Sequence, residues 1–280
     1  MTTYELEPED NIGEILRTAP EGPVTLILRY GIWREKVVVT RPDVTIVSEE
    51  GAVIQADDRN GTIRGDVSFG IGESATFTVA APAFTAMGVT FTNSFDYESA
   101  VKWNREHKNE PPLSLEAPAF RSAFGSDVIT LRACNFRGHN GTLMLDYGNA
   151  FLEDCTVEGT QDFILGAGSA LFQGCDILSL EGGTIIAPST PRENPLGFLF
   201  HDCNFATEEG LKDASVFLAH PWHPYGAESR NPMVLLVDCS LSSHVSNALW
   251  SDLETLGLDG VEKTWRDANS RFYIYSDTHE

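Results

Sequence analysis

Short segments in which apolar and polar residues alternate recur along most of this chain. Five of them share the pattern apolar-x-apolar-x-x-Cys-x-apolar: residues 129–136 (ITLRACNF), 150–157 (AFLEDCTV), 170–177 (ALFQGCDI), 198–205 (FLFHDCNF) and 234–241 (VLLVDCSL). Residues 84–91 (FTAMGVTF) fit the same frame, with Val89 in the place of the cysteine. A period of two is typical of β-strands, and no helical period of 3.6 accompanies it. The segments therefore form an internal repeat of short strands.

A repeat of this kind predicts a solenoid of parallel strands, in which each coil stacks about 4.8 Å above the one before. Equivalent positions of successive repeats then form continuous files of inward side chains. The expected files are Leu131, Leu152, Phe172, Leu199 and Leu236, and beside them Phe136, Val157, Ile177, Phe205 and Leu241. The pattern thus predicts an all-β fold, a parallel β-helix, as a single domain over residues 1–280.

The two ends of such a stack need covers, because an open coil exposes apolar side chains and unpaired backbone groups. Asp10 or Asn11 followed by Ile12–Thr18 predicts an N-capped helix with Ile12, Ile15 and Leu16 on one face. We expect this short helix to cover the first coil. Residues 248–258 are expected to do the same at the other end.

Composition agrees with a folded globular chain and excludes two classes of partner. Of the 280 residues, 42% are apolar and 21% charged, which is enough apolar material for a core. The chain holds 41 acidic and 19 basic residues, a formal charge of −22, so nucleic acid is not an expected partner. No apolar run of membrane-spanning length occurs, and a membrane is not expected either. The acidic start predicts a cytoplasmic protein, or a secreted one whose leader has been removed.

The five cysteines have a structural explanation. Val89 occupies the same slot in a sixth repeat, so the slot requires a small buried apolar group rather than a thiol. An odd count without a Cys-x-x-Cys pair argues against a zinc site and against a disulfide framework. We expect reduced thiols stacked on neighbouring coils, as in a reducing compartment.

Several segments resemble, in the same order, the signature motifs of the pectin methylesterase (pectinesterase) family. They are residues 31–35 (GIWRE), similar to Gly-x-Tyr-x-Glu; 88–93 (GVTFTN), similar to Gly-Leu/Val-Thr-Phe-x-Asn; 158–166 (EGTQDFILG), similar to Glu-Gly-x-Val-Asp-Phe-Ile-Phe-Gly; 218–222 (LAHPW), similar to Leu-Gly-Arg-Pro-Trp; and 272–275 (FYIY), similar to the closing strand. The resemblance covers residues 10–278. It implies a right-handed, single-stranded parallel β-helix, a galacturonan-type polysaccharide or oligosaccharide as partner, and no cofactor.

The resemblance also implies a reaction. The family hydrolyses the methyl ester of galacturonic acid and releases methanol through two aspartates, one a nucleophile and the other an acid and base. Glutamines stabilise the oxyanion, and an arginine holds the nucleophile. Asp162 matches the nucleophile in this sequence. A carboxylate in so apolar a segment would be costly to bury without a partner, which independently favours a functional or paired role.

The other chemical positions differ from the family pattern. Residues 140–142 (NGT) stand where the family has Gln-Asp-Thr, so Asn140 takes a glutamine position and Gly141 takes that of the acid/base. Glu116 replaces the second glutamine, and His220 replaces the arginine. With Asp162, the candidate catalytic set is therefore Asp162, Glu116, Asn140 and His220.

Two interpretations follow. In the first, Glu116 supplies the missing carboxyl and the protein is a carboxylic ester hydrolase. A protonated His220 would then hold Asp162, which predicts higher activity under mildly acidic conditions. In the second, the fold has lost its catalyst and binds carbohydrate without hydrolysing it. Loss of a general acid costs about 10²–10⁴ in rate.

Four further residues are candidate substrate contacts: Trp222, Trp250, His139 and Phe163. Aromatic faces stack on sugar rings, which favours the two tryptophans. No metal is expected, since a His-x-x-His at 220–223 near Asp162 is a weak pattern. The polar excursions at residues 93–115 and 206–213 are expected to wall the groove.

Other enzymes that use β-helices fit less well. Hydrolases of the polygalacturonase type need a cluster of aspartates, and lyases need calcium ligands and a basic residue in the cleft; neither pattern is found. The strongly negative charge favours a short or methyl-esterified substrate over a long polyanion. A monomer is expected.

Overall fold

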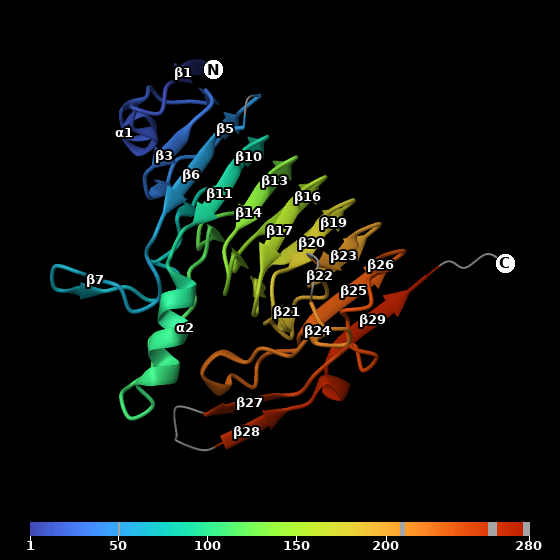
Figure 1. The fold of residues 1–280 in the computed structure, drawn as a ribbon. Helices are drawn as coiled ribbons and strands as arrows, with labels where there is room; N and C mark the ends of the chain where they lie inside the picture. The colour runs from blue at the N-terminus through green and yellow to red at the C-terminus, as the bar shows by residue number, and fades with distance from the viewer. Residues whose placement is uncertain (50, 208–210, 257–261, 277–280) are drawn as a thin grey trace.

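Three parallel β-sheets run along the length of the molecule in a computed structural model that describes residues 1–49, 51–207, 211–256 and 262–276 (Figure 1). The chain visits the sheets in turn: β13 (Val128–Arg132) lies in the first, β14 (Asn135–Arg137) in the second, β15 (Leu143–Leu145) in the third, and β16 (Asn149–Glu153) again in the first. Each circuit is one coil of a parallel β-helix. The coils turn in the right-handed sense that parallel crossovers take.

The strands of each sheet follow one another in order along the axis. Sheet 1 has ten strands: β1 (Thr2–Leu6), β2 (Val24–Leu28), β5 (Val44–Val47), β10 (Phe84–Met87), β13, β16, β19 (Ser169–Gln173), β22 (Phe198–His201), β25 (Met233–Val237) and β29 (Arg271–Tyr275). Sheet 2 has eight: β3 (Ile32–Arg34), β6 (Val53–Ala56), β11 (Thr90–Asn93), β14, β17 (Thr156–Gly159), β20 (Asp176–Ser179), β23 (Asn204–Thr207) and β26 (Ser240–Leu241). Sheet 3 has seven: β4 (Val37–Val39), β9 (Phe77–Val79), β12 (Phe120–Ser122), β15, β18 (Ile164–Gly166), β21 (Gly183–Pro188) and β24 (Val216–Ala219).

The first predicted inward file is confirmed except at one position. Leu152 pairs with Phe172, but the next member is Phe200 and not Leu199. The rings of Phe172 and Phe200 stack at 4.3 Å between centroids, whereas Leu199 is half-buried. The prediction that Leu199 faces inward was wrong. The aligned repeat places the third residue of each segment inside, and in residues 198–205 that residue is Phe200.

The second file follows the expected register to its end, where Phe205 pairs with Leu241. Phe205 is fully buried, but Leu241 is 36% exposed. β26 is the last strand of sheet 2, so no further coil covers Leu241. Every member of this file is therefore apolar, and only Leu241, at the open end of sheet 2, is not buried.

The cysteines lie where sheet 1 turns into sheet 2. The residue before each of them adopts a positive φ, and these residues are Ala133, Asp154, Gly174, Asp202 and Asp238. Aspartate and glycine tolerate this left-handed conformation better than most residues, which explains their use in the turn. All five thiols are free, and four of them are buried. The structural interpretation of the cysteines is confirmed, and the reducing compartment stays a prediction.

The N-terminal cover is the predicted helix, α1 (Ile12–Thr18). Asn11 is its N-cap and accepts a hydrogen bond from the backbone N–H of Glu14 at 2.6 Å. Ile12 and Leu16 are buried against the first coil. The carboxylate of Glu35 also accepts from the N–H groups of Ile12 and Gly13, both at 2.8 Å. The glutamate of the 31–35 motif thus holds the covering helix on the solenoid.

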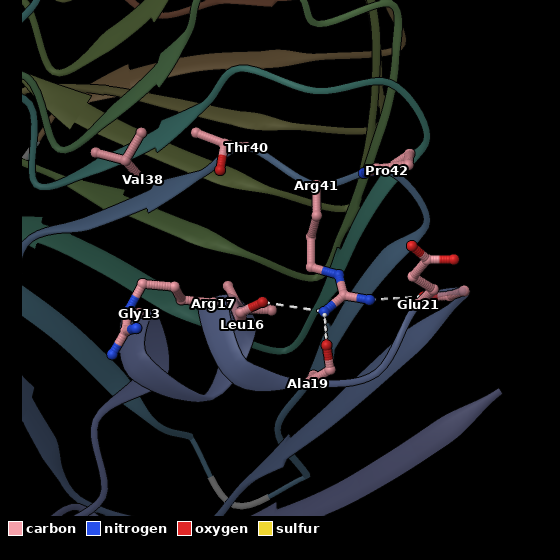
Figure 2. A pocket seen from close by; sticks show the side chains of 10 residues that line it. Gly13, Leu16, Arg17, Ala19, Glu21, Val38, Thr40, Arg41 and Pro42 are labelled. Carbon is pink, nitrogen blue, oxygen red and sulfur yellow. Dashed lines mark hydrogen bonds between the residues drawn. The ribbon is translucent and has the colours of Figure 1, made fainter.

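The C-terminal end of α1 is held by Arg41 (Figure 2). Its guanidinium donates to the backbone carbonyls of Leu16, Ala19, Pro20 and Gly22 at 2.5–3.0 Å. A cavity of about 590 Å³ lies beside it. Arg41 satisfies carbonyls that the helix leaves unpaired, so its role here is structural.

The other end has no helical cover in residues 248–256, and that prediction was wrong. Trp250 forms a bridge with Ala219, and the chain continues as β27 (Leu253–Leu256), which pairs with β28 (Glu262–Trp265) in an antiparallel hairpin. Residues 257 and 258 lie outside the described residues. Between β28 and β29 lies a 3-10 helix, η2 (Asp267–Asn269).

Three excursions project from the stacked strands low in the view of Figure 1: the hairpin of β7 (Ile63–Arg64) and β8 (Val67–Ser68), helix α2 (Tyr97–Glu106), and the β27–β28 hairpin. A second 3-10 helix, η1 (Pro224–Gly226), follows β24 and contacts β27. Among the described residues, no helix is long and apolar enough to span a membrane.

Candidate active site

Asp162 lies in the turn between β17 of sheet 2 and β18 of sheet 3. Its φ is 48°, a left-handed conformation that aspartate tolerates. Its backbone N–H donates to the carbonyl of Thr184 on the next coil at 2.6 Å. Phe163 follows with its side chain fully buried in the core. The turn is therefore fixed on both sides, and the Asp162 side chain remains 27% exposed.

Two side chains meet the same oxygen of Asp162. His220 Nε2 lies 3.1 Å from Oδ1, and Gln161 Nε2 donates to Oδ1 at 2.7 Å. The side chain of His220 is only 7% exposed, and Gln161 Oε1 accepts from the N–H of Thr184 at 3.2 Å. In the part of the chain that the structure describes, both of these side chains reach the carboxylate through Oδ1.

Gln161 is the functional residue that sequence reasoning missed. It stands where the family motif has valine, and an amide side chain next to a candidate nucleophile was the available signal. The sequence does not show that this amide turns back onto its neighbour. That contact depends on the turn, in which Gln161 and Asp162 both bond to the backbone of Thr184.

Glu116, Asn140 and Gln161 form a file across three successive coils. Parallel bridges join Glu116 to Asn140 and Asn140 to Gln161. Two strand spacings of about 4.8 Å therefore separate the backbone of Glu116 from that of Gln161. Glu116 Oε2 accepts from Asn60 Nδ2 at 3.3 Å. The structure thus places His220 and Gln161 against Asp162. The Glu116 carboxyl contacts Asn60, which lies on a preceding coil.

Gly141 leaves an open space between these groups. A Cβ at this position would lie 3.7 Å from the Cβ of Glu116, 3.8 Å from Ile71 Cδ1 and 3.9 Å from Leu165 Cδ2, which are ordinary contacts. The φ of Gly141 is 75°, close to that of Asp162. An aspartate here would therefore have room for its Cβ, but it would have to adopt a left-handed φ, as Asp162 does.

An apolar patch lies beside this space on the outer face of sheet 3. Met144, Leu165 and Ala187 occupy one position on three adjacent strands, and Ile71 and Trp222 pack against them. A groove of about 830 Å³ runs past this patch and past Glu116. Its lining includes Asn60, Ile71, Glu116, Arg121, Met144, Asp146, Tyr147, Asn194, Trp222 and Arg230. The combination of apolar floor, aromatic side chain and polar rim is typical of a saccharide groove.

The candidate substrate contacts fall into different places. Trp222 lines the groove, as predicted. Phe163 is fully buried and faces the core, so its assignment as a substrate contact was wrong. The strand that follows Asp162 alternates, and Phe163 occupies an inward position. Trp250 packs against Phe272 at 5.2 Å, outside the described lining of the groove, and a role in substrate binding stays a prediction.

His139 is covered by the excursion at residues 93–115. Tyr97 of α2 stacks on its ring at 4.5 Å and 2°. Burial lowers the pKa of His139, against the opposing charges of Glu98 and Glu181. The described groove lining takes no residue from α2, and a role of this excursion as a groove wall stays a prediction. The excursion at 206–213 lies partly outside the described residues.

His223 does not join His220 and Asp162. Its Nδ1 lies 2.8 Å from the carbonyl of Ala227, and its ring stacks on Trp265 at 3.7 Å. In the described part of the chain no group of three possible metal ligands is found.

Comparison with known proteins agrees with this geometry. A family model described as Pectinesterase matches residues 10–259. The chain belongs to the pectinesterase family. A curated relative, Pectinesterase A of Dickeya chrysanthemi, is 26% identical, and the match covers 94% of this chain and 78% of the relative. The predicted class, a carboxylic ester hydrolase of the pectinesterase type, is confirmed by this membership.

Solved structures confirm the fold of the family. Pectin methylesterase PemA from Erwinia chrysanthemi superposes with a TM-score of 0.88 at 24% identity, over 100% of this chain and 90% of that one. A pectin methylesterase crystallised with a hexasaccharide gives a TM-score of 0.87 at 24% identity, over 96% and 85% of the two chains. The solenoid of parallel strands predicted from the repeats, and the right-handed parallel β-helix implied by the resemblance, are therefore confirmed.

Proposed function

We propose that this pectinesterase-family protein hydrolyses methyl esters of galacturonan-type chains and releases methanol, with Asp162 as the nucleophile. The observation that carries the proposal is the double hold on Oδ1 of Asp162 by His220 and Gln161, beside a groove with an aromatic wall. A fixed, partly exposed carboxylate is suited to attack an ester carbonyl. The described groove lining includes Glu116 and Trp222, while Asp162 itself lies outside that lining.

In the first step, Oδ2 of Asp162 forms a bond to the ester carbonyl carbon. The carbon–methoxy bond then breaks, and methoxide takes a proton to leave as methanol. Glu116 is the carboxyl of the groove lining that belongs to the same file as Asn140 and Gln161, so we assign the proton donation to Glu116, directly or through one water. The backbone of Asn140 lies between those of Glu116 and Gln161, and we assign the stabilisation of the developing oxyanion to its amide.

In the second step, water attacks the acyl-enzyme carbonyl and gives its proton to the Glu116 carboxylate. The bond to Asp162 breaks, which restores the aspartate and releases the free acid of the sugar. His220 and Gln161 do not take part in proton transfer. Both keep the Asp162 carboxylate in one orientation through the two steps, as positioning residues.

A second function, carbohydrate binding without hydrolysis, is favoured by one observation. The family acid/base position is Gly141, and the described contact of the Glu116 carboxyl is with Asn60 rather than with Asp162. In this second function the groove and Trp222 bind the saccharide chain, and no ester is cleaved.

Methanol release from methyl-esterified galacturonan oligomers between pH 5 and 8 separates the two functions. Asp162→Asn removes the nucleophile and is expected to lower release by about 10³-fold or more. Asp154→Asn is the matched control, because Asp154 also adopts a left-handed φ, 52°, in a turn before a buried residue. Saccharide binding by the wild type with no methanol release would establish the binding protein instead.

A further inference from the structure

Asn60 bonds to Glu116 through both its backbone and its side chain. The N–H of Asn60 donates to the carbonyl of Glu116 at 2.8 Å. Its Nδ2 donates to Oε2 of the Glu116 carboxyl at 3.3 Å. Both residues line the groove, although 56 positions separate them in the sequence. The backbone bond holds the two residues together, and the amide is then close enough to fix the direction of the carboxyl.

The segment that carries Asn60 is itself held in place. The guanidinium of Arg59 donates to the carbonyl of Asn60 at 2.7 Å and to the carbonyl of Ser114 at 3.4 Å. Ser114 lies two residues before Glu116, so Arg59 joins the two segments. The N–H of Arg59 also donates to Thr62 Oγ1, and the N–H of Thr62 donates back to the carbonyl of Arg59, both at 2.9 Å. Asn60 therefore stands in a turn that is closed by hydrogen bonds.

Asn93 joins the same two segments from a buried position. It is the last residue of the 88–93 motif, and it is 4% exposed. Its Nδ2 donates to the carbonyl of Asp58 at 2.8 Å and to the carbonyl of Pro118 at 3.1 Å. Asp58 lies two residues before Asn60. Pro118 lies two residues after Glu116. Hydrogen bonds on both sides of the contact therefore fix the backbone from which the two side chains meet.

Among the residues that the structure describes, Glu116 forms no ion pair. The charged residues of the groove lining and of the neighbouring turns are Arg59, Glu73, Arg121, Asp146, Asp162 and Arg230. Arg121 Nε lies 3.4 Å from Asp146 Oδ2, and the charge of Arg230 acts on the same carboxylate. Glu73 Oε2 accepts from the N–H of Gly70 at 3.1 Å. The described polar contact of the Glu116 carboxyl is therefore with a neutral donor, the amide of Asn60.

A neutral donor suits the task that the mechanism gives to Glu116. This carboxyl must hold a proton until methoxide leaves, and it must be a carboxylate when water attacks the acyl-enzyme. A cation beside it would favour the carboxylate in both steps and would weaken it as an acid. An amide carries no net charge, and it offers N–H donors to the carboxylate and an oxygen acceptor to the protonated acid. Asn60 can therefore hold the group in either form.

We propose that Asn60 is a positioning residue, which orients the carboxyl of Glu116 for proton transfer in both steps of ester hydrolysis. Glu116 gives its proton to methoxide and regains one from the attacking water, while Asn60 exchanges no proton. This inference rests on the proposed function for the role of Glu116. The contact between the two side chains does not depend on that role, so it can be measured without substrate.

Kinetics with methyl-esterified galacturonan oligomers test the positioning role. Asn60→Ala is expected to lower kcat for methanol release by about 10-fold and to change KM less than about twofold, because one hydrogen bond that orients the acid is lost. In a Glu116→Gln background the same substitution should change kcat less than about twofold. A rise in KM at unchanged kcat would overturn the proposal, since Asn60 would then be a substrate contact. Equal losses of kcat in both backgrounds would overturn it as well.

The pH profile of kcat/KM gives a second readout. Asn60→Asp keeps the shape of the side chain and places a like charge beside Glu116. A like charge keeps a carboxyl protonated to higher pH, so the alkaline limb of the profile is expected to move up by about one pH unit. Asn204→Asp is the matched control and should keep the wild-type profile, because Asn204 Nδ2 donates to Asp176 Oδ1 at 3.1 Å on sheet 2, outside the described groove lining. An unmoved limb in Asn60→Asp would contradict the positioning role.

A titration by NMR makes the test independent of catalysis. The signal of the Glu116 side-chain carboxyl carbon is assigned by its absence in Glu116→Gln. Its titration midpoint is expected at higher pH in Asn60→Asp than in the wild type, and unchanged in Asn204→Asp. Equal midpoints in all three proteins would show that the contact is absent and would overturn the proposal. A wild type that releases no methanol, with the midpoint still moved in Asn60→Asp, would overturn only the proposed function.

Discussion

His220 Nε2 lies 3.1 Å from Oδ1 of Asp162, the same oxygen that accepts a hydrogen bond from Gln161. The family pattern supplies an arginine at position 220, whose fixed positive charge needs no proton from solution. In this protein the side chains of His220 and Gln161 together hold the Asp162 carboxylate, so the hold is divided between a histidine and an amide. This divided hold is expected to affect activity, the open position at Gly141 tests which group supplies the proton, and a buried histidine, His244, is expected to affect stability.

Replacing His220 tests its part in holding Asp162. His220→Gln is expected to lower kcat for methanol release by about 10- to 100-fold with little change in KM, because the residue orients the nucleophile and does not line the groove. His220→Arg should retain kcat, because a guanidinium also donates to Oδ1 of Asp162. His201→Gln replaces a histidine whose ring contacts Gln173 on sheet 1, and is the control. An unchanged kcat in His220→Gln would contradict this role.

Gln161→Val restores the residue of the family motif and removes the donor to Asp162. We expect kcat to fall by about 10-fold, the effect of losing one hydrogen bond to a charged group. In a His220→Arg background the same substitution should cost less, because the arginine supplies the missing donors. Steady-state kinetics of the four proteins measure this coupling. Equal losses in both backgrounds would mean that Gln161 acts apart from position 220.

Gly141→Asp is expected to change methanol release by less than about threefold, because Glu116 already supplies the general acid, whose contribution is about 10²–10⁴. The added Cβ makes ordinary contacts, and Asp162 shows that aspartate adopts a left-handed φ in the equivalent turn. Gly141→Asn has the same shape without the acid and is the control. A gain of about 10²-fold in Gly141→Asp over Gly141→Asn would show that Glu116 does not supply the proton.

His244 makes stability depend on pH. It is 1% exposed, neither ring nitrogen has a partner among the described residues, and burial lowers its pKa. Below about pH 6.5 the unfolded chain takes up a proton that the folded chain refuses, so the free energy of unfolding falls as pH falls toward the lower folded pKa. Burial lowers the pKa of His139 and His223 in the same direction.

Thermal unfolding between pH 8 and pH 5 measures this dependence. His244→Leu is expected to lose less stability over that range than the wild type, by up to about 1.4 kcal/mol per pH unit at the steepest point. His107→Gln replaces a histidine whose ring contacts the carbonyl of Trp103, and should keep the wild-type slope. Parallel curves for wild type and His244→Leu would show that His244 does not contribute.

The repeat pattern was enough to predict the solenoid, because alternation and a cysteine-aligned frame state which residues face inward. A separate local pattern, Asn11 followed by three apolar residues on one helical face, predicted the covering helix α1. The misplaced member, Leu199, departs from the cysteine-aligned frame, which puts the third residue of the segment, Phe200, inside, and the strand pairing confirms Phe200. The sequence prediction failed at residues 248–256, where an apolar segment carries no signal that separates a helix from an extended cover.

The sequence by itself determined the family, the coil and the position of Asp162, since these follow from local motifs and from periodicity. Tertiary structure alone decided which side chains meet there. Gln161 and His220 are 59 residues apart, and they share one oxygen only because stacked coils bring distant turns into register. The same stacking buried Phe163 and left space at Gly141. Contacts between coils depend on side-chain rotamers and on pairing across the stack, which no single segment of the chain encodes.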